Sequence, residues 1–395
     1  MAAGVNLLDP AVLADPYPSL HRLRREAPVH WDETHGVWML SRYRDALAAL
    51  RDVRVYSSEI HGGERTALDT TNWFVFHDAP RHARLRGLVT EAFTPSVVER
   101  LRPRVAGLVD GLLDRIDDAG GGDLVADLGF PLPAMVIAEL LGVPSDALDD
   151  FKRWSADLAA LGSTVKQAAD RVDRVRRAQA SAAALNAYFA DVVRRRGNRS
   201  AEGDDLIARL TRARAEGDRL DERELVETCT FLLFTGHETT TNLIGNGMLA
   251  LLRHPDELRA VAATPGGIAP AVEELLRFDS PVQVRVRVLR EDVSIDGERL
   301  RAGQRVWILL GAANRDPERF PEPDRLLPAR TDNRHLAFGY GAHFCVGAAL
   351  ARLEGATAIG ALLARFPRIR LASDAVRWRP NTTMRGLEAL PIDVR

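Results

Sequence analysis

Cys345 has the surroundings that best suit chemistry at a metal. It is one of two cysteines in 395 residues and stands in Phe338-Gly339-Tyr340-Gly341-Ala342-His343-Phe344-Cys345-Val346-Gly347. A helical pattern begins at Ala348, so the sulfur precedes a helix N-terminus, where backbone N–H groups favour a thiolate. Glycines let backbone approach a sulfur or a flat ligand. The local pattern leaves two interpretations open: a metal-ligating sulfur, and a free core cysteine, which is the commoner fate of a lone cysteine.

A second group of reactive side chains interrupts an apolar helix expected over 221–253. Its centre, Thr235-Gly236-His237-Glu238-Thr239-Thr240-Thr241-Asn242, is poor helix material. Threonine hydroxyls there compete for backbone carbonyls, and a carboxylate on an apolar helix is costly without a role. We interpret this as a functional notch, with a solvent-facing polar patch as the alternative. A zinc-protease motif needs a second histidine where Thr241 stands.

A third pair, Glu274 and Arg277, lies three residues apart and therefore on one helix face. Taken alone the pair is weak, because most such pairs are exposed salt bridges that contribute little stability.

Composition limits the classes of protein that can carry these groups. Apolar residues make up 46% and charged residues 27%, with a net charge of −2, which gives no reason to expect nucleic acid binding. Cys229 falls on an apolar helical stripe and is expected to pack, so no disulfide framework is predicted. Neither a signal peptide nor a membrane span is recognisable, and we expect a cytoplasmic protein without membrane contact.

The elements that position these groups are mostly helices, with small β-sheets near both ends of the chain. No repeat or linker divides the sequence, so residues 1–395 are expected to form a single domain. Helices are expected over 96–119, 133–142, 146–161, 164–196, 221–253, 270–278 and 348–365, and strands over 29–31, 37–40, 293–295, 305–310, 368–371 and 388–394.

Together these motifs resemble the cytochrome P450 family of haem-thiolate monooxygenases in its soluble bacterial form. The cysteine loop matches the family pattern Phe-Gly-x-Gly-x-His-x-Cys-x-Gly at each fixed place, and the notch matches its small-Gly-x-acid-Thr-Thr motif. Glu274 and Arg277 match its Glu-x-x-Arg pair. The resemblance adds Arg319, from Pro317-Glu318-Arg319-Phe320, as the third member of a buried structural triad.

The resemblance implies the cytochrome P450 fold, with haem b between the long central helix and the cysteine-loop helix. Cys345 would be the axial thiolate, and Phe338, Gly339 and Gly347 would shape its loop. The cations implied for the haem propionates are His82, Arg86, Arg287 and His343.

The resemblance also assigns Glu238 and Thr239 as the catalytic acid–alcohol pair. Thr239 would hydrogen-bond dioxygen at the haem, and Glu238 would bring protons from solvent. No flavin or iron–sulfur segment is present, so electrons are expected from a ferredoxin or flavodoxin with an NAD(P)H-dependent reductase. Arg352 is either a docking charge for such a partner or a solvated residue. A monomer is expected.

The implied substrate pocket is mostly apolar, which fits a hydrophobic small molecule from the terpenoid, steroid, fatty acyl or polyketide class, as in secondary metabolism. Hydroxylation is expected; desaturation, epoxidation and C–C coupling on the same cofactor, or a non-catalytic haem-thiolate sensor, are the alternatives. The pocket would draw on a loop at 57–76, helices near 158–175, and the candidates Trp73, Phe74, Leu232, Thr235, Gly236, Val282, Gln283, Val284, Thr382 and Thr383.

Overall fold

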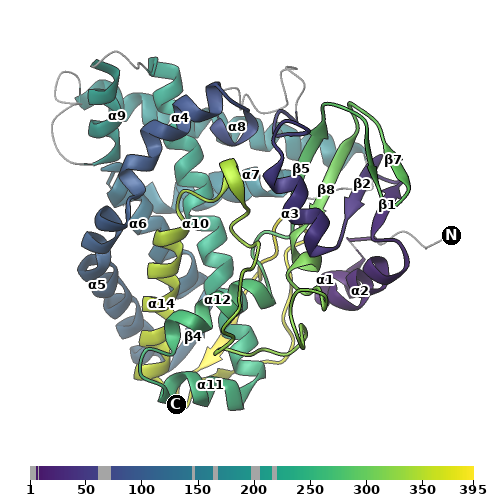
Figure 1. The fold of residues 1–395 in the computed structure, drawn as a ribbon. Helices are drawn as coiled ribbons and strands as arrows, with labels where there is room; N and C mark the ends of the chain where they lie inside the picture. Colours follow the sequence, from purple (N-terminus) through teal and green to yellow (C-terminus); the bar gives the residue numbers. More distant parts are fainter. Residues whose placement is uncertain are drawn as a thin grey trace.

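The structure, a computed structural model, is dominated by helices packed around one long central helix (Figure 1). It describes residues 6–7, 9–60, 73–144, 147–162, 168–196, 205–215 and 220–395. The predicted loop at 57–76 and the helices near 158–175 are therefore only partly covered, since residues 61–72 and 163–167 lie outside the described residues.

The central helix is α10 (Glu222–Arg253), which begins at a capping box formed by Asp221 and Glu224. Nearly all of its side chains are buried, which matches a helix surrounded by other helices. Its neighbours include α6, α8, α12 and α14. The helices of this part are α4 (Arg81–Thr90), α5 (Pro95–Ala119), α6 (Pro131–Leu141), α7 (Leu148–Ala159), α8 (Ala168–Arg196), α9 (Leu206–Ala215), α11 (Pro255–Ala263), α12 (Ile268–Phe278) and α14 (Ala348–Arg365).

The expected notch does not interrupt α10, because the helix runs unbroken through Thr235-Gly236-His237-Glu238-Thr239. The hydroxyl of Thr235 donates to the Phe231 carbonyl at 2.8 Å, and that of Thr239 to the Thr235 carbonyl at 3.2 Å. The side chains thus bond to carbonyls four residues back without opening the helix. Cys229 of the same helix is fully buried, as predicted.

A five-stranded sheet with short helices forms the other part of the molecule. The strand order is β1-β2-β8-β5-β3, and the β2–β8 pair is parallel, while the other pairs are antiparallel. Its elements are β1 (Val29–Asp32), β2 (Val37–Leu40), β3 (Tyr56–Ser57), β5 (Val284–Leu289), β8 (Arg305–Leu309), α1 (Pro10–Ala14), α2 (Tyr17–Glu26), α3 (Tyr43–Arg51) and α13 (Leu310–Ala313).

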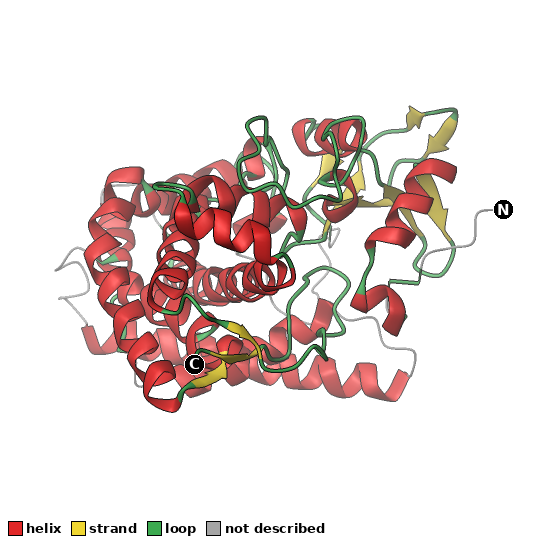
Figure 2. Ribbon diagram, turned by 90° about the horizontal axis from the view of Figure 1, so that it is seen from below, coloured by secondary structure: helices red, strands yellow, loops and turns green. Residues whose placement is uncertain are grey.

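Two smaller sheets complete the fold. One pairs β6 (Val293–Ile295) with β7 (Glu298–Leu300), and the other has the order β4 (Gly121–Asp123), β10 (Pro391–Asp393), β9 (Arg370–Leu371). Figure 2 shows the second of these beneath the helices, near the C-terminus, away from the five-stranded sheet. The predicted fold class, mainly α with small sheets, is confirmed.

Candidate active site

The cysteine loop is a tight turn held by backbone hydrogen bonds ahead of α14. The N–H of Cys345 donates to the carbonyl of Phe338 at 2.9 Å, and Gly347 is the N-cap of α14. Gly339 and Gly341 have φ values of 71° and 70°, a backbone conformation that other residues rarely adopt. The glycine pattern therefore sets the path of the chain around the sulfur, as predicted.

Several charges act on the Cys345 thiol. Burial raises its pKa, while the N–H of Gly347 and the positive charges of Arg285, Arg86 and Arg352 oppose that rise. A sulfur surrounded by an N–H donor and guanidinium groups suits a metal-bound thiolate.

The outer side of the loop is braced by an ion pair. Both Arg352 Nε and Nη2 donate to the carboxylate of Glu273, at 2.6 and 2.8 Å, and the guanidinium lies 4.5 Å from the centre of the Phe338 ring. Arg352 is therefore neither an unattached docking charge nor a simply solvated residue.

Two histidines expected to serve the propionates stack on each other. The rings of His82 and His343 lie 3.9 Å apart, and His343 Nε2 lies 3.0 Å from Ser58 Oγ and 3.9 Å from Asp78. Burial, with the charge of His343, lowers the pKa of His82 to about 4. Burial alone would raise the pKa of Asp78, but the nearby His343, with hydrogen bonds from Ser57 and the Ser58 N–H and the charge of Arg290, holds it at about 2.

The two predicted arginines reach the same region from α4 and β5. Arg86 Nη2 donates to the Phe344 carbonyl in the cysteine loop at 2.6 Å. Arg287 is 5% exposed, yet its Nε has no hydrogen-bond partner in the structure, and neither has Nε2 of His82. Buried polar atoms are normally satisfied, so these unpaired donors beside Cys345 fit a cofactor that carries carboxylates. The residues present thus fit haem.

The predicted acid–alcohol pair lies side by side on α10. The Glu238 carboxylate is buried and accepts a hydrogen bond of 2.6 Å from Nη1 of Arg379, which comes from the C-terminal loop. The sequence patterns did not single out this partner. Glu238 is therefore held by a charge that belongs to a distant segment.

His237 points away from this pair. It is buried against Phe130, with Nδ1 lying 2.7 Å from the Leu233 carbonyl. In the part of the chain that the structure describes, no group of three His, Cys, Asp or Glu residues is arranged to hold a metal ion.

The predicted triad needs a correction in its third member. Glu274 and Arg277 have no solvent exposure and pair through two hydrogen bonds of 2.8 Å. The second arginine on Glu274 is Arg330, whose Nε lies 3.1 and 3.2 Å from the two oxygens. Arg319 pairs instead with the exposed carboxylate of Asp332. The prediction of Arg319 is wrong because the loop after α13 turns it outward.

The aromatic and helical candidates for the substrate pocket gather on α10. Trp73 packs 5.2 Å from Phe231 and 5.9 Å from Phe234, and Phe74 packs on the edge of Phe231. Leu232 is buried and Thr235 partly buried on the same helix.

Gly236 is the remaining candidate on α10. A Cβ at Gly236 would lie 3.0 Å from Ile137, so this position faces α6. The glycine therefore permits close packing of two helices, and its place in the pocket stays a prediction.

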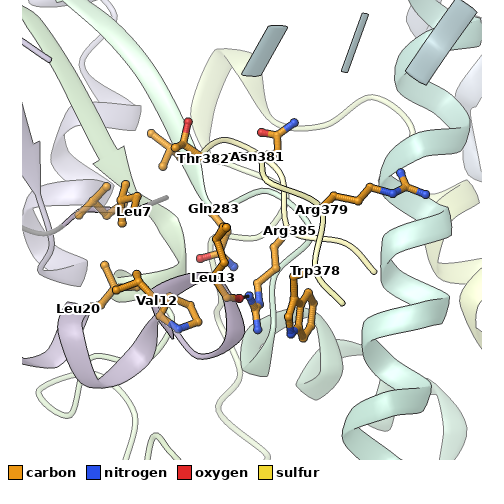
Figure 3. A pocket seen from close by; sticks show the side chains of 13 residues that line it. Leu7, Val12, Leu13, Leu20, Gln283, Trp378, Arg379, Asn381, Thr382 and Arg385 are labelled. Atoms are coloured by element: carbon orange, nitrogen blue, oxygen red, sulfur yellow. Dashed lines mark hydrogen bonds between the residues drawn. The ribbon is translucent and has the colours of Figure 1, made fainter. Parts of the chain in front are cut away.

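The remaining candidates lie where β5 meets the C-terminal loop, and three of them line a pocket beside the N-terminal helices. The Gln283 N–H donates to the Thr383 carbonyl at 2.8 Å, and Val282 bridges to Met384. Gln283, Val284 and Thr382 line the pocket, shown in Figure 3 with side chains from α1 and α2. Figure 3 also shows Arg379 extending away from the N-terminal side chains, in keeping with its bond to Glu238.

Comparison with known proteins decides the family. The family model described as "Cytochrome P450" matches residues 19–263 and 269–388. The chain belongs to the cytochrome P450 family. Cytochrome P450 107B1 of Saccharopolyspora erythraea is 40% identical, over 97% of this chain and 96% of that protein. The vitamin D(3) 25-hydroxylase of Pseudonocardia autotrophica is 41% identical, over 96% and 93%.

A solved structure of the family has the same fold. CYP109E1 from Bacillus megaterium in complex with testosterone has a TM-score of 0.92 and 33% identity, over 98% of this chain and all of that chain. The chain is thus a haem-thiolate monooxygenase that uses haem b. Bacterial P450 proteins normally take electrons from redox partners and act on hydrophobic substrates. Among the described residues, no helix is both long and apolar enough to cross a membrane.

Proposed function

We propose that this P450 hydroxylates a hydrophobic small molecule with dioxygen, residues 1–395 acting as one domain and as a monomer. The observation that carries the proposal is the adjacent Glu238 and Thr239 on α10, with the Glu238 carboxylate buried and held by Arg379. A binding protein or sensor would not need a buried acid beside an alcohol. Desaturation, epoxidation and C–C coupling would use the same residues and differ in how the substrate lies.

Bound haem supplies the activation of dioxygen, and the chain supplies the ligand and the protons. Cys345 would hold the haem iron through its thiolate, and haem held by a thiolate would supply the oxidising chemistry. His82, Arg86, Arg287 and His343 would hold the propionates. The Thr239 hydroxyl would position the oxygen by a hydrogen bond, and the Glu238 carboxylate would bring protons to it from solvent.

Electrons are proposed to come from a ferredoxin or flavodoxin with its NAD(P)H-dependent reductase, and the site of action to be the cytoplasm. Cys229 and Cys345 are both free, which suits a reducing compartment. The Arg352–Glu273 pair on the cysteine side leaves Arg352 39% exposed, so it can still attract an acidic partner.

The proposed substrate is an apolar molecule bound against Trp73, Phe74, Leu232 and Thr235, and beside the strand and turn at 282–284 and 382–383. One relative is named for vitamin D(3), and one solved relative holds testosterone. Steroid-like compounds are therefore the first to test, with terpenoid, fatty acyl and polyketide compounds in the same screen.

The experiment compares product and peroxide formation by Thr239→Ala and Thr240→Ala. Surrogate redox partners supply the electrons, and the substrate is one that changes the spin state of the haem when it binds. Thr240 is the neighbouring buried threonine, and its hydroxyl lies 3.5 Å from the Gly236 carbonyl, so it controls for loss of a mid-helix hydroxyl. Thr239→Ala should still consume NADH but form hydrogen peroxide in place of product, whereas Thr240→Ala should stay coupled.

Unchanged coupling in Thr239→Ala would remove Thr239 from the proposal. Tight ligand binding without turnover by the wild-type enzyme, over a broad set of compounds, would favour the sensor.

A further inference from the structure

Arg285 is an arginine of the site that neither the motifs nor the resemblance assigned. It lies two residues before Arg287 on β5, where the antiparallel register places Arg285 opposite Ile308 and Arg287 opposite Val306 of β8. Alternate side chains of a strand project to the same face, so both guanidinium groups point to one side of the sheet. Both guanidinium groups lie near the cysteine loop, because the charge of Arg285 acts on the Cys345 thiol and the charge of Arg287 acts on His343, two residues before it.

Arg285 has no carboxylate partner among the described residues. No hydrogen bond or ion pair joins its guanidinium to any other described side chain, although Arg285 is only partly exposed. Asp78, a buried carboxylate whose charge acts on Arg287, is already bonded by Ser57, the Ser58 N–H and Arg290.

The two arginines also repel each other. Burial, followed by the charge of Arg285, lowers the pKa of Arg287 to about 10. Arg287 is 5% exposed, and its Nε has no hydrogen-bond partner among the residues that the structure describes. Two neighbouring guanidinium groups, one of them buried, are unfavourable unless an anion lies between or beside them. Their placement therefore indicates an anion supplied by a bound molecule.

The chemistry of that anion follows from the donors. A guanidinium is a planar fork that binds a carboxylate through two parallel hydrogen bonds. The thiolate of Cys345 does not meet this need, because a sulfur that ligates iron has given its charge to the metal and offers no planar pair of acceptors.

We propose that Arg285 is a carboxylate-binding residue of the haem site, acting with Arg287 on a carboxylate of a molecule bound beside Cys345. A haem propionate is the source that the pairing with Arg287 favours, and the carboxylate of an acidic substrate is the other source. The inference rests on haem binding beside Cys345, which the absorption spectrum of the wild-type enzyme checks separately.

The test compares Arg285→Gln and Arg285→Lys with the wild type. Arg299→Gln is the matched control, because Arg299 lies on β7, pairs with the exposed Asp292, and loses the same charge away from the site. The haem-loaded proteins are mixed with excess apomyoglobin, and the rate of haem transfer is followed by absorbance. Far-UV circular dichroism of the haem-free forms separates folding from haem retention.

Arg285→Gln should lose haem about ten- to a hundredfold faster than the wild type, as expected for loss of a charged hydrogen bond. Arg285→Lys should be intermediate and Arg299→Gln unchanged. In a second arm, a long-chain fatty acid and its methyl ester are titrated and the spin-state change is recorded. If Arg285→Gln loses haem at the wild-type rate but binds the fatty acid about tenfold or more weakly, with binding of the methyl ester unchanged, the carboxylate belongs to the substrate.

Two results would overturn the proposal. One is an Arg285→Gln enzyme that matches the wild type in both arms. The other is an Arg285→Gln enzyme that changes only the position of the absorption band of the reduced carbon monoxide complex, because Arg285 would then act on the Cys345 sulfur.

Discussion

Replacing Arg330 by Gln tests the corrected network around Glu274. Arg330 Nε lies 3.1 and 3.2 Å from the two Glu274 oxygens, and the two side chains are 7% and 0% exposed. Losing this charged donor should lower the free energy of unfolding by about 1.5–3 kcal/mol. A buried charge left without any partner would cost about 3–5 kcal/mol. We expect a smaller destabilisation here, because Arg277, the Leu327 N–H and Asn333 still bind the Glu274 carboxylate.

Arg319→Gln is the matched control, since the resemblance gave Arg319 the same role. Its partner Asp332 has a side chain that is 66% exposed, and exposed ion pairs contribute little. Glutamine also keeps most of the aliphatic stem of Arg319 beside Tyr43 and Phe320.

Unfolding of both variants in urea is followed by far-UV circular dichroism, and the midpoints are compared at equal slope. The midpoint of Arg330→Gln should fall well below that of Arg319→Gln. The corrected network is refuted if Arg319→Gln is destabilised as much as Arg330→Gln.

Three further predictions concern single residues. Cys345→Ser should abolish the thiolate-type red-shifted band of the reduced carbon monoxide complex; a retained band would overturn Cys345 as the ligand. Arg379→Gln should divert NADH to peroxide, because Glu238 loses the donor that holds it, and Arg379→Lys should restore part of the product yield. Burial raises the pKa of Glu354 well above its usual value, and its Oε2 has no hydrogen-bond partner in the structure. Because the folded protein holds this proton more tightly than the unfolded chain, stability is greatest below the unfolded pKa and is lost as pH rises above it. The urea midpoint of the wild type should therefore fall relative to that of Glu354→Gln as pH rises above about 4.3, the ordinary pKa of glutamate. Parallel curves would mean that Glu354 is ionised in the folded protein.

Local sequence patterns predicted much of the fold, because turns and helix ends depend on the conformational preferences and hydrogen bonds of neighbouring residues. The glycines at 339 and 341 mark left-handed backbone, and the capping box at Asp221 marks the start of α10 within one residue. α9 (Leu206–Ala215) was not predicted from the sequence. Its ten residues carry a mixed polar pattern, and tertiary packing determines that it is helical.

Contacts between side chains that are far apart in the sequence were harder to predict. Arg379 and Glu238 are 141 residues apart, and no periodicity connects them. The close approach of Gly236 to Ile137 of α6 was likewise not predicted from the motif that contains this glycine. Sequence patterns specify which face of a helix is special, but they do not specify what lies opposite each position on that face.

The error at Arg319 shows at which positions a family resemblance predicts the role of a residue reliably. Residues such as Cys345 and the loop glycines must meet a cofactor of fixed shape, so their spacing is tightly constrained. A residue that only neutralises the buried carboxylate of Glu274 needs to reach it with one guanidinium, and Arg319, Arg325 and Arg330 all follow α12 within one loop-rich stretch. Which arginine turns inward depends on how that stretch folds, and here the backbone carbonyls of Pro321 and Glu322 bind the rest of the Arg330 guanidinium. Those carbonyls fix Arg330 as the inward residue.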